Sequence, residues 1–123
     1  MKVLLINGSP HEKGCTYTAL SLIAKELNDA GVDTEILHVG GKPVGGCIGC
    51  GGCAVFGGVV NEAIEKAKTA DGFVFGSPVH YASASGNMTS FMDRLAYAGG
   101  RYLAYKPAAI CCSARRAGTT TTL

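Results

Sequence analysis

The sequence predicts an α/β fold in which helices cover both faces of a parallel sheet. Short apolar runs containing β-branched residues alternate along the chain with longer segments whose apolar residues recur at helical spacing. The strand-like runs are almost wholly apolar, which is typical of strands buried between two helical layers. A chain of 123 residues is long enough for one core. We therefore expect a single domain over residues 1–123, with a cysteine-rich loop at 41–58.

The first half of the chain contains two predicted strands with a helix between them. Residues 2–8 (KVLLING) form an apolar run that ends in Asn-Gly, a turn signal. Residues 16–31 follow with apolar side chains at helical spacing and a closing glycine, which predicts a helix. Residues 33–40 (DTEILHVG) are predicted to form the second strand.

The same alternation continues beyond the cysteine-rich loop. It predicts four further elements: a helix at 59–70, an apolar strand at 72–78, a helix at 86–99 and a fourth buried strand at 107–114. Cys111 and Cys112 fall inside that last strand, where we expect them to be buried small residues.

Composition excludes several classes of function. Hydrophobic residues at 47% and charged residues at 16% indicate a folded chain. Eleven Lys and Arg against nine Asp and Glu give a net charge of +2 without a basic run, so we expect no nucleic-acid partner. The N-terminal apolar run is too short for a signal peptide or a membrane span, so we expect a cytoplasmic protein. In that reducing compartment, the six cysteines are better explained as ligands, redox groups or packing residues than as disulfides.

A ligand site is expected beyond the carboxyl ends of the strands. In open parallel sheets ligands bind where the strand order reverses, here between the first and third strands. Loops 8–16, 76–86 and 112–120 reach that place, and all three are rich in Gly, Ser, Thr and Pro. In the first loop, Ser9, Thr16 and free backbone N–H groups at a helix start suit a terminal phosphate, or the two side chains simply cap the helix. The loop lacks the P-loop ending and the G-x-G-x-x-G pattern, which disfavours ATP and dinucleotides.

The cysteine-rich loop places Cys47, Cys50 and Cys53 at three-residue intervals, with glycine in most of the gaps. Two successive C-x-x-C spacings let three thiolates reach one cubane, so the spacing favours a [4Fe–4S] cluster. A zinc site formed with His38 is a weaker alternative. Full ligation of a cubane takes a fourth thiolate, and no cysteine follows Cys53 closely, so we expect an incomplete cluster site.

Four stretches together resemble the NADPH-dependent FMN reductase family, and within it the iron–sulfur flavoprotein branch. They are LLINGSPHEKGCT, CIGCGGC, DGFVFGSPVHYASASGNMTSFMDRL and KPAAICCSARRAGTTTT, and they cover nearly the whole chain in order. The resemblance implies a flavodoxin-like doubly wound parallel sheet of order 2-1-3-4-5, with FMN lying across the three loops. Relatives have extra polar residues after the third cysteine and a last helix, strand and helix. We therefore expect residues to be missing between Cys53 and the next helix, and after Leu123.

The resemblance also assigns cofactor-binding residues in each loop. They are Ser9, Cys15 and Thr16 at the phosphate, Pro78, Val79 and His80 along the isoalloxazine ring, and Ser113, Arg115 and Gly118 on its far side. Cys15 stands where the family usually has Asn, and His80 where it usually has Tyr. Cys47, Cys50 and Cys53 would be the metal ligands.

Two functions follow from the resemblance. The first is an FMN-dependent NAD(P)H oxidoreductase that passes electrons to a small acceptor such as a quinone or flavin, with no catalytic side chain because the cofactor does the chemistry. The alternative is an iron–sulfur flavoprotein electron carrier with a [4Fe–4S] cluster and a redox-protein partner. A non-catalytic module that binds flavin or a nucleotide is a third possibility. Flavins in this family lie near subunit contacts and an open sheet edge needs cover, so we expect a homodimer or homotetramer.

Overall fold

A parallel sheet forms the centre of the structure, a computed structural model that describes residues 1–53 and 55–123. Its strands are β1 (Lys2–Asn7), β2 (Asp33–His38), β3 (Gly72–His80) and β5 (Ala108–Ser113). β2 pairs with β1, β1 with β3, and β3 with β5, all in parallel. This confirms the predicted order 2-1-3-4, in which β5 is the fourth strand. The short β4 (Ser83–Ala84) folds back antiparallel on the end of β3.

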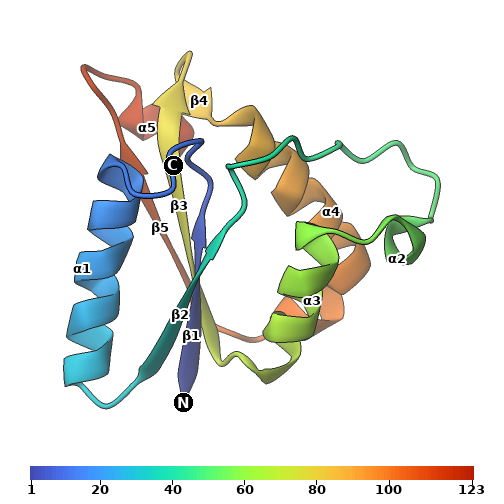
Figure 1. The fold of residues 1–123 in the computed structure, drawn as a ribbon, viewed down its shortest axis with the longest axis horizontal. Helices are drawn as coiled ribbons and strands as arrows, with labels where there is room; N and C mark the ends of the chain where they lie inside the picture. Colours follow the sequence, from blue (N-terminus) through green and yellow to red (C-terminus); the bar gives the residue numbers. More distant parts are fainter.

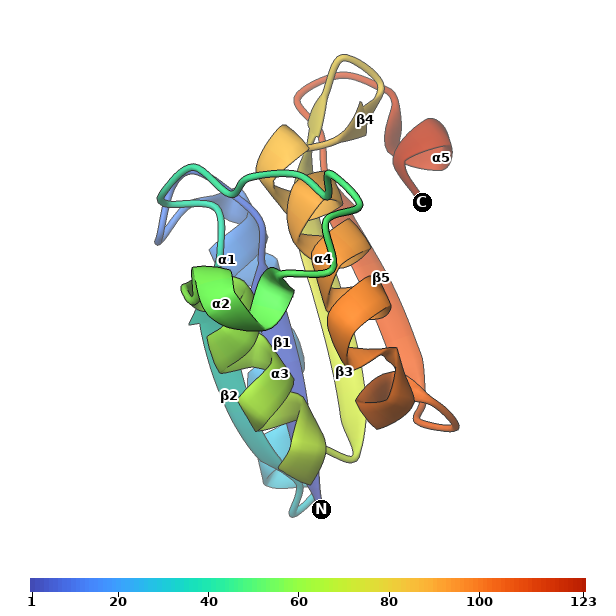
Figure 2. The ribbon, with the colours of Figure 1, turned by 90° about the vertical axis from the view of Figure 1, so that its right-hand side faces the viewer.

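Helices cover both faces of this sheet (Figures 1 and 2). α1 (Cys15–Asp29) lies on one face, while α3 (Val59–Thr69) and α4 (Gly86–Leu103) pack side by side on the other. α2 (Cys53–Phe56) ends the cysteine-rich loop, and α5 (Thr119–Thr122) follows the loop after β5. The predicted α/β class is therefore confirmed. Among the described residues, no helix combines the length and the apolar character that a membrane span requires.

The sheet divides the hydrophobic core into two parts. Side chains alternate along β1, so that Leu4 and Ile6 join the cluster under α3 and α4, whereas Leu5 joins the cluster under α1. Phe91 of α4 and Leu20 of α1 are fully buried on the two sides. This packing holds the carboxyl ends of the strands in fixed relative positions.

β5 is much less buried than the sequence predicts. Residues 107–114 were expected to form a buried strand, yet Ala108, Ala109 and Ile110 are exposed, and Cys111 and Cys112 are only half-buried. The physical reason is that β5 is an edge strand: it pairs with β3, and no other strand of the described chain lies beyond it. The prediction of burial for this strand was therefore wrong.

α4 continues past the point where the sequence predicts its end. The helix was predicted at 86–99, but α4 runs on to Leu103. A Cβ at Gly99 would lie 2.9 Å from Cγ1 of Ile64 on α3, so the glycine allows a close contact between the two helices. Helix packing, rather than a helix stop, explains this residue.

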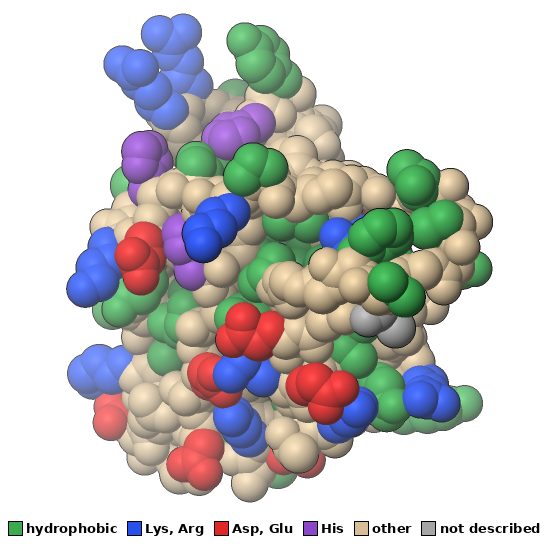
Figure 3. All heavy atoms as spheres, turned by 45° about the vertical axis from the view of Figure 1, so that its right-hand side comes forward, with side chains coloured by type: hydrophobic (Ala, Val, Ile, Leu, Met, Phe, Trp, Pro, Cys, Tyr) green, Lys and Arg blue, Asp and Glu red, His purple; other side chains and the backbone are tan. Residues whose placement is uncertain are grey.

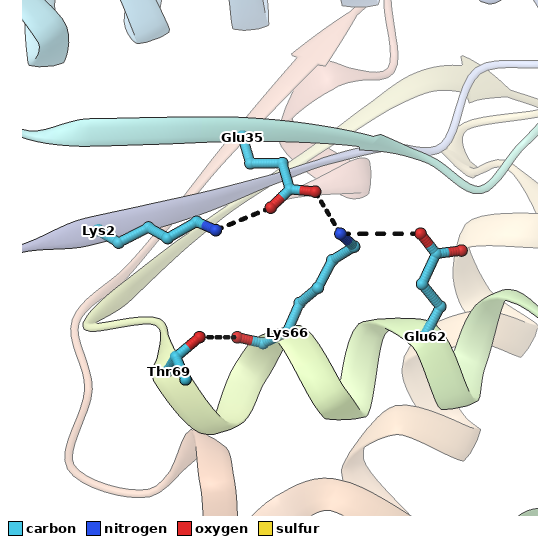
Figure 4. Close-up of polar contacts among 5 residues, drawn as sticks. All are labelled: Lys2, Glu35, Glu62, Lys66 and Thr69. Carbon is cyan, nitrogen blue, oxygen red and sulfur yellow. Dashed lines mark hydrogen bonds and ion pairs between the residues drawn. The ribbon is translucent and has the colours of Figure 1, made fainter.

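Acidic and basic side chains are interspersed on the face drawn in Figure 3, and one group of them links the sheet to α3 (Figure 4). Glu35 of β2 accepts from Lys2 Nζ of β1 at 2.9 Å and also from Lys66 Nζ of α3. Lys66 Nζ lies 3.8 Å from Glu62 Oε1 as well. The hydrogen bond from Lys66, followed by that from Lys2, lowers the pKa of the Glu35 carboxyl.

Candidate functional site

The loops that follow β1, β3 and β5 meet at one end of the sheet (Figure 1). They are joined there by buried hydrogen bonds. The N–H of Gly8 donates to the carbonyl oxygen of Gly76 at 2.8 Å. Ser85 Oγ donates to the carbonyl oxygen of Gly8 at 2.7 Å, and the N–H of Ser85 donates to Ser77 Oγ at 2.9 Å. The first two loops therefore form one connected surface.

The loop after β1 is shaped by the fully buried Asn7. The N–H of Ser9 donates to Asn7 Oδ1 at 3.0 Å, and Asn7 Nδ2 donates to the carbonyl oxygen of Glu12 at 3.1 Å. The N–H of His11 donates to Ser9 Oγ at 3.1 Å. These bonds curl the loop back toward the start of α1.

The start of α1 provides hydrogen-bond donors that no side chain caps. Its N-cap residue is Gly14, so no side-chain hydrogen bond caps the helix. The first turn of the helix also holds no acidic residue. The first backbone N–H groups of a helix have no partner inside the helix, and they carry the positive end of its dipole. Ser9 and Thr16 are both buried beside this end. This donor set fits a terminal phosphate, and the helix-capping alternative for Ser9 and Thr16 is not what the structure shows.

A glycine behind this loop allows an unusually close approach of two backbones. A Cβ at Gly40 would lie 2.2 Å from the carbonyl oxygen of Ser9, a distance that no side chain tolerates. The same oxygen lies 2.7 Å from Nε2 of His38. His38 was the histidine of the weaker, zinc-binding alternative. In the structure its side chain holds the loop after β1 in place.

The loop after β3 forms a tight hairpin. Val79 pairs with Ala84 and His80 with Ser83, and the two residues between them, Tyr81 and Ala82, have φ of +49° and +61°. Pro78 and Val79 are half-buried, whereas His80 is exposed. Ser85 ends the hairpin and caps α4 by accepting from the N–H of Met88 at 3.2 Å. A serine just before an apolar helical pattern is a cap signal that sequence reasoning could have used.

The loop after β5 contacts both of the other loops. Ser113 Oγ lies 3.0 Å from Thr16 Oγ1 of α1. Gly118 has φ of +97°, and a Cβ there would lie 2.9 Å from Cγ1 of Val79. Thr121 Oγ1 donates to the carbonyl oxygen of Ala82 at 2.7 Å. The hairpin and the third loop are thus in direct contact.

The structure brings together most of the residues that the sequence assigned to FMN. Ser9, Thr16 and Ser113 lie at the start of α1, and Gly118 packs against Val79 next to Pro78. Cys15, His80 and Arg115 are exposed at the rim of this surface. Their roles toward FMN stay predictions.

The cysteine-rich loop begins beside the loop after β1 and then runs along α4. Its start is fixed by Asn87 Oδ1, which accepts from the N–H of Val44 at 3.2 Å, and by Arg94 Nη1, which donates to the carbonyl oxygen of Gly45 at 3.2 Å. Cys47, Cys50 and Cys53 line a hollow of about 370 Å³ together with apolar side chains. Figure 3 shows several exposed hydrophobic side chains on this side of the molecule, and others elsewhere on its surface.

The three cysteines do not form a ligand set in this arrangement. Within residues 1–53 and 55–123, no three His, Cys, Asp or Glu side chains are placed to hold one metal ion. Cys47 and Cys50 are exposed, whereas Cys53 is buried at the start of α2. The loop as folded therefore does not fit a cluster, and cluster ligation stays a prediction from the spacing alone.

Comparison with known families gives one match along the whole chain. The model of the family described as NADPH-dependent FMN reductase matches residues 1–123. An iron–sulfur flavoprotein of Methanocaldococcus jannaschii is 34% identical over 99 residues, which are 76% of this chain and 51% of that protein. An iron–sulfur flavoprotein of Archaeoglobus fulgidus is 32% identical over 106 residues, 82% of this chain and 48% of that protein. The chain thus spans about half the length of these relatives.

Solved structures agree on the fold. The apo form of an NADH:FMN oxidoreductase (EMOB) superposes with a TM-score of 0.75 at 21% identity, covering 99% of this chain and 63% of that one. An NAD(P)H:quinone oxidoreductase from Methanothermobacter marburgensis gives a TM-score of 0.71 at 17% identity, covering 93% and 66%. At these identities the likeness supports the flavodoxin-like arrangement of strands and helices.

Proposed function

This chain belongs to the NADPH-dependent FMN reductase family, and from that premise we propose that it binds FMN across loops 8–16, 76–86 and 112–120. We propose further that it passes electrons from a reduced nicotinamide to a small acceptor such as a quinone or flavin. Two structural neighbours, an NADH:FMN oxidoreductase and an NAD(P)H:quinone oxidoreductase, are consistent with this class of reaction.

One observation carries the proposal: the start of α1 is uncapped, and two buried hydroxyls lie beside it. Ser9 is 4% exposed and Thr16 is 2% exposed, so both side chains would meet a phosphate with little competition from water. Ser113 Oγ extends the same set of donors through its contact with Thr16. Phosphate at a helix start is a common and favourable arrangement. Cys15 would lie at the rim of this phosphate site.

The other two loops would hold the flavin ring. Pro78 and Val79 offer a half-buried apolar edge, with His80 beside them, and Gly118 lets the third loop approach that edge closely. Arg115 would lie on the open side. Bound FMN would supply the redox chemistry itself, so the task of these residues is to bind and orient, and we propose no catalytic acid or base.

The names of the relatives favour a second candidate, an iron–sulfur flavoprotein electron carrier. It ranks second because the described cysteines do not gather around one point.

We also propose a homodimer or homotetramer, since Ile110 on the edge strand β5 is 53% exposed and a second chain would cover it. Light scattering of the FMN-loaded chain checks this, and a monodisperse monomer would contradict it.

The experiment that tests the FMN site compares two ligands that differ only in the phosphate. We expect Ser9→Ala combined with Thr16→Ala to weaken FMN binding at least roughly 100-fold, because two charge-assisted hydrogen bonds are worth about 1.5 to 3 kcal/mol each. Riboflavin binding should change little. Thr18→Ala is the matched control, because Thr18 lies in the same helical turn but is exposed. Equal losses for FMN and riboflavin in the double variant would contradict the assignment.

A further inference from the structure

We propose that Cys47 and Cys50 form a redox-active dithiol that reduces disulfides outside the chain. Both thiols are exposed, whereas Cys53 is buried at the start of α2. The two exposed thiols therefore are the pair that an external disulfide can reach. The proposed activity is thiol–disulfide exchange on the cysteine-rich loop, outside the three loops assigned to FMN.

The backbone between the two cysteines is suited to closing a disulfide. Gly49 has φ of +69°, the sign that the third position of a type II turn requires. Such a turn over residues 47–50 brings the first and last Cα atoms within about 7 Å, and disulfides span about 4.4 to 6.8 Å. Ile48, which would be the second residue of such a turn, is 80% exposed, so closure breaks no core packing.

The surroundings of the pair leave room for that movement. A Cβ placed at Gly45, Gly49 or Gly51 would meet no atom within 4 Å. Before the pair, the loop is held on α4 through Val44 and Gly45, and after the pair α2 contacts α4. Closure of residues 47–50 therefore needs no rearrangement of the helices.

An apolar hollow next to the pair can receive an organic disulfide. The cavity of about 370 Å³ is lined by the three cysteines of the loop, by Arg94, and by the side chains of Ile48, Phe56 and Tyr97. Phe56 and Tyr97 are 64% and 67% exposed, so they are accessible as contact surfaces. The chemical class that fits is a small disulfide with apolar or neutral substituents.

The dithiol also explains why the cysteine spacing of this loop is typical of a cluster although the folded loop does not bring three ligands together. The C-x-x-C-x-x-C spacing favours a cluster, yet the described residues place no three ligands together. The remaining cysteines lie elsewhere, Cys15 at the start of α1 and Cys111 and Cys112 on β5. A two-cysteine function needs neither a third nor a fourth ligand.

The exchange balances without a further reactant. The deprotonated thiol of Cys50 attacks one sulfur of the external disulfide and releases one thiolate, which gives a mixed disulfide. Cys47 then attacks the sulfur of Cys50, releases the second thiolate and closes the Cys47–Cys50 disulfide. Two chain thiols are oxidised and one external disulfide is reduced to two thiols. Reopening the Cys47–Cys50 disulfide is the reverse exchange, in which an external dithiol is oxidised to its disulfide and the two chain thiols are restored.

The test uses the reduced chain, without air, and bis(2-hydroxyethyl) disulfide as the probe. We expect free thiols to fall from six to four per chain, with the loss mapped to Cys47 and Cys50 by mass spectrometry. Cys47→Ser should stop at the mixed disulfide on Cys50, and Cys47→Ser with Cys50→Ser should slow the release of thiol at least tenfold. Cys112→Ser is the matched control and should behave like the original chain.

Three results would overturn the proposal. They are six thiols remaining after treatment with the probe, a disulfide that involves Cys15, Cys111 or Cys112 instead, and iron and sulfide bound stoichiometrically through all three loop cysteines after anaerobic reconstitution. The exchange itself requires no flavin and no nicotinamide. Its failure is therefore distinguishable from failure of the proposed function, which shows as FMN that NAD(P)H does not reduce.

Discussion

Replacing Gly40 by alanine should damage phosphate binding while leaving the rest of the fold in place. An alanine Cβ at this position would lie 2.2 Å from the carbonyl oxygen of Ser9, 2.4 Å from its carbonyl carbon and 2.6 Å from the carbonyl carbon of Gly8. All three atoms belong to the backbone. The clash therefore cannot be relieved by rotating a side chain.

The size of the effect follows from this geometry. Ordinary contacts between heavy atoms lie near 3.5 Å, so the two backbone segments must separate by about 1 Å. They are held together by the N–H of Gly40, which donates to the carbonyl oxygen of Asn7 at 3.2 Å, and by His38 Nε2 at 2.7 Å from the oxygen of Ser9. Overpacking of this kind costs about 1 to 3 kcal/mol of stability. Loss of one charge-assisted hydrogen bond to phosphate weakens FMN binding by roughly 10- to 150-fold.

The assay is equilibrium titration of FMN and of riboflavin against Gly40→Ala and against Gly45→Ala. Gly45 is the matched control, because it belongs to the same connection and a Cβ there meets nothing within 4 Å. We expect a loss for FMN only, and only in Gly40→Ala. If a folded Gly40→Ala chain bound FMN as tightly as Gly45→Ala, the assignment of the phosphate to this loop would be refuted.

Two further predictions concern the ring loops and the sheet. Gly118→Ala should weaken FMN and riboflavin equally, because φ of +97° strains any side chain and the new Cβ would lie 2.9 Å from Val79; Gly100→Ala, with open space around it, is the control in the same titration. Glu35→Gln should lower the free energy of unfolding at pH 7 by about 1 kcal/mol or less per ion pair lost. Since the two lysines lower the pKa of Glu35 below 4.5, this contribution is present above that pH and disappears as pH falls through the lowered pKa. Urea unfolding at pH values from 7 to below the lowered pKa checks this contribution, with Glu26→Gln, at an exposed position of α1, as the control. A difference in unfolding free energy between Glu35→Gln and the original chain that persists at the lowest pH would contradict the ion-pair explanation.

The four parallel strands and the three long helices could be predicted because apolar periodicity is a local property, and each of these elements follows from residues within its own segment. The order of the strands was implied by the resemblance to the family and not by the periodicity. Exposure of β5 could not be predicted in this way, because it depends on what lies beside the strand and not on its own apolar residues. The β3–β4 hairpin was also missed, since Tyr81 and Ala82 adopt positive φ without being glycine.

In the candidate site, too, local sequence features could be predicted, whereas contacts between distant segments could not. Ser9 and Thr16 were found because a loop followed by a helix start is visible in the sequence. Gly40 and Ser85 were missed as site residues because their contacts join distant segments: Ser85 bonds to Gly8 across 77 positions. At the cysteine-rich loop, spacing alone predicts that three sulfurs can converge, but convergence depends on the path of the backbone, which four left-handed glycines between 49 and 58 determine.

The proposed function requires this chain to bind FMN and to reduce it with a nicotinamide. The visible absorption spectrum of the FMN-loaded chain, recorded without air before and after one equivalent of NADH or NADPH, tests both requirements. We expect one FMN per chain to be retained through gel filtration and its oxidised absorption band to be lost with at least one of the two nicotinamides. A chain that retains no FMN, or whose bound FMN stays oxidised with both, would contradict the proposed function.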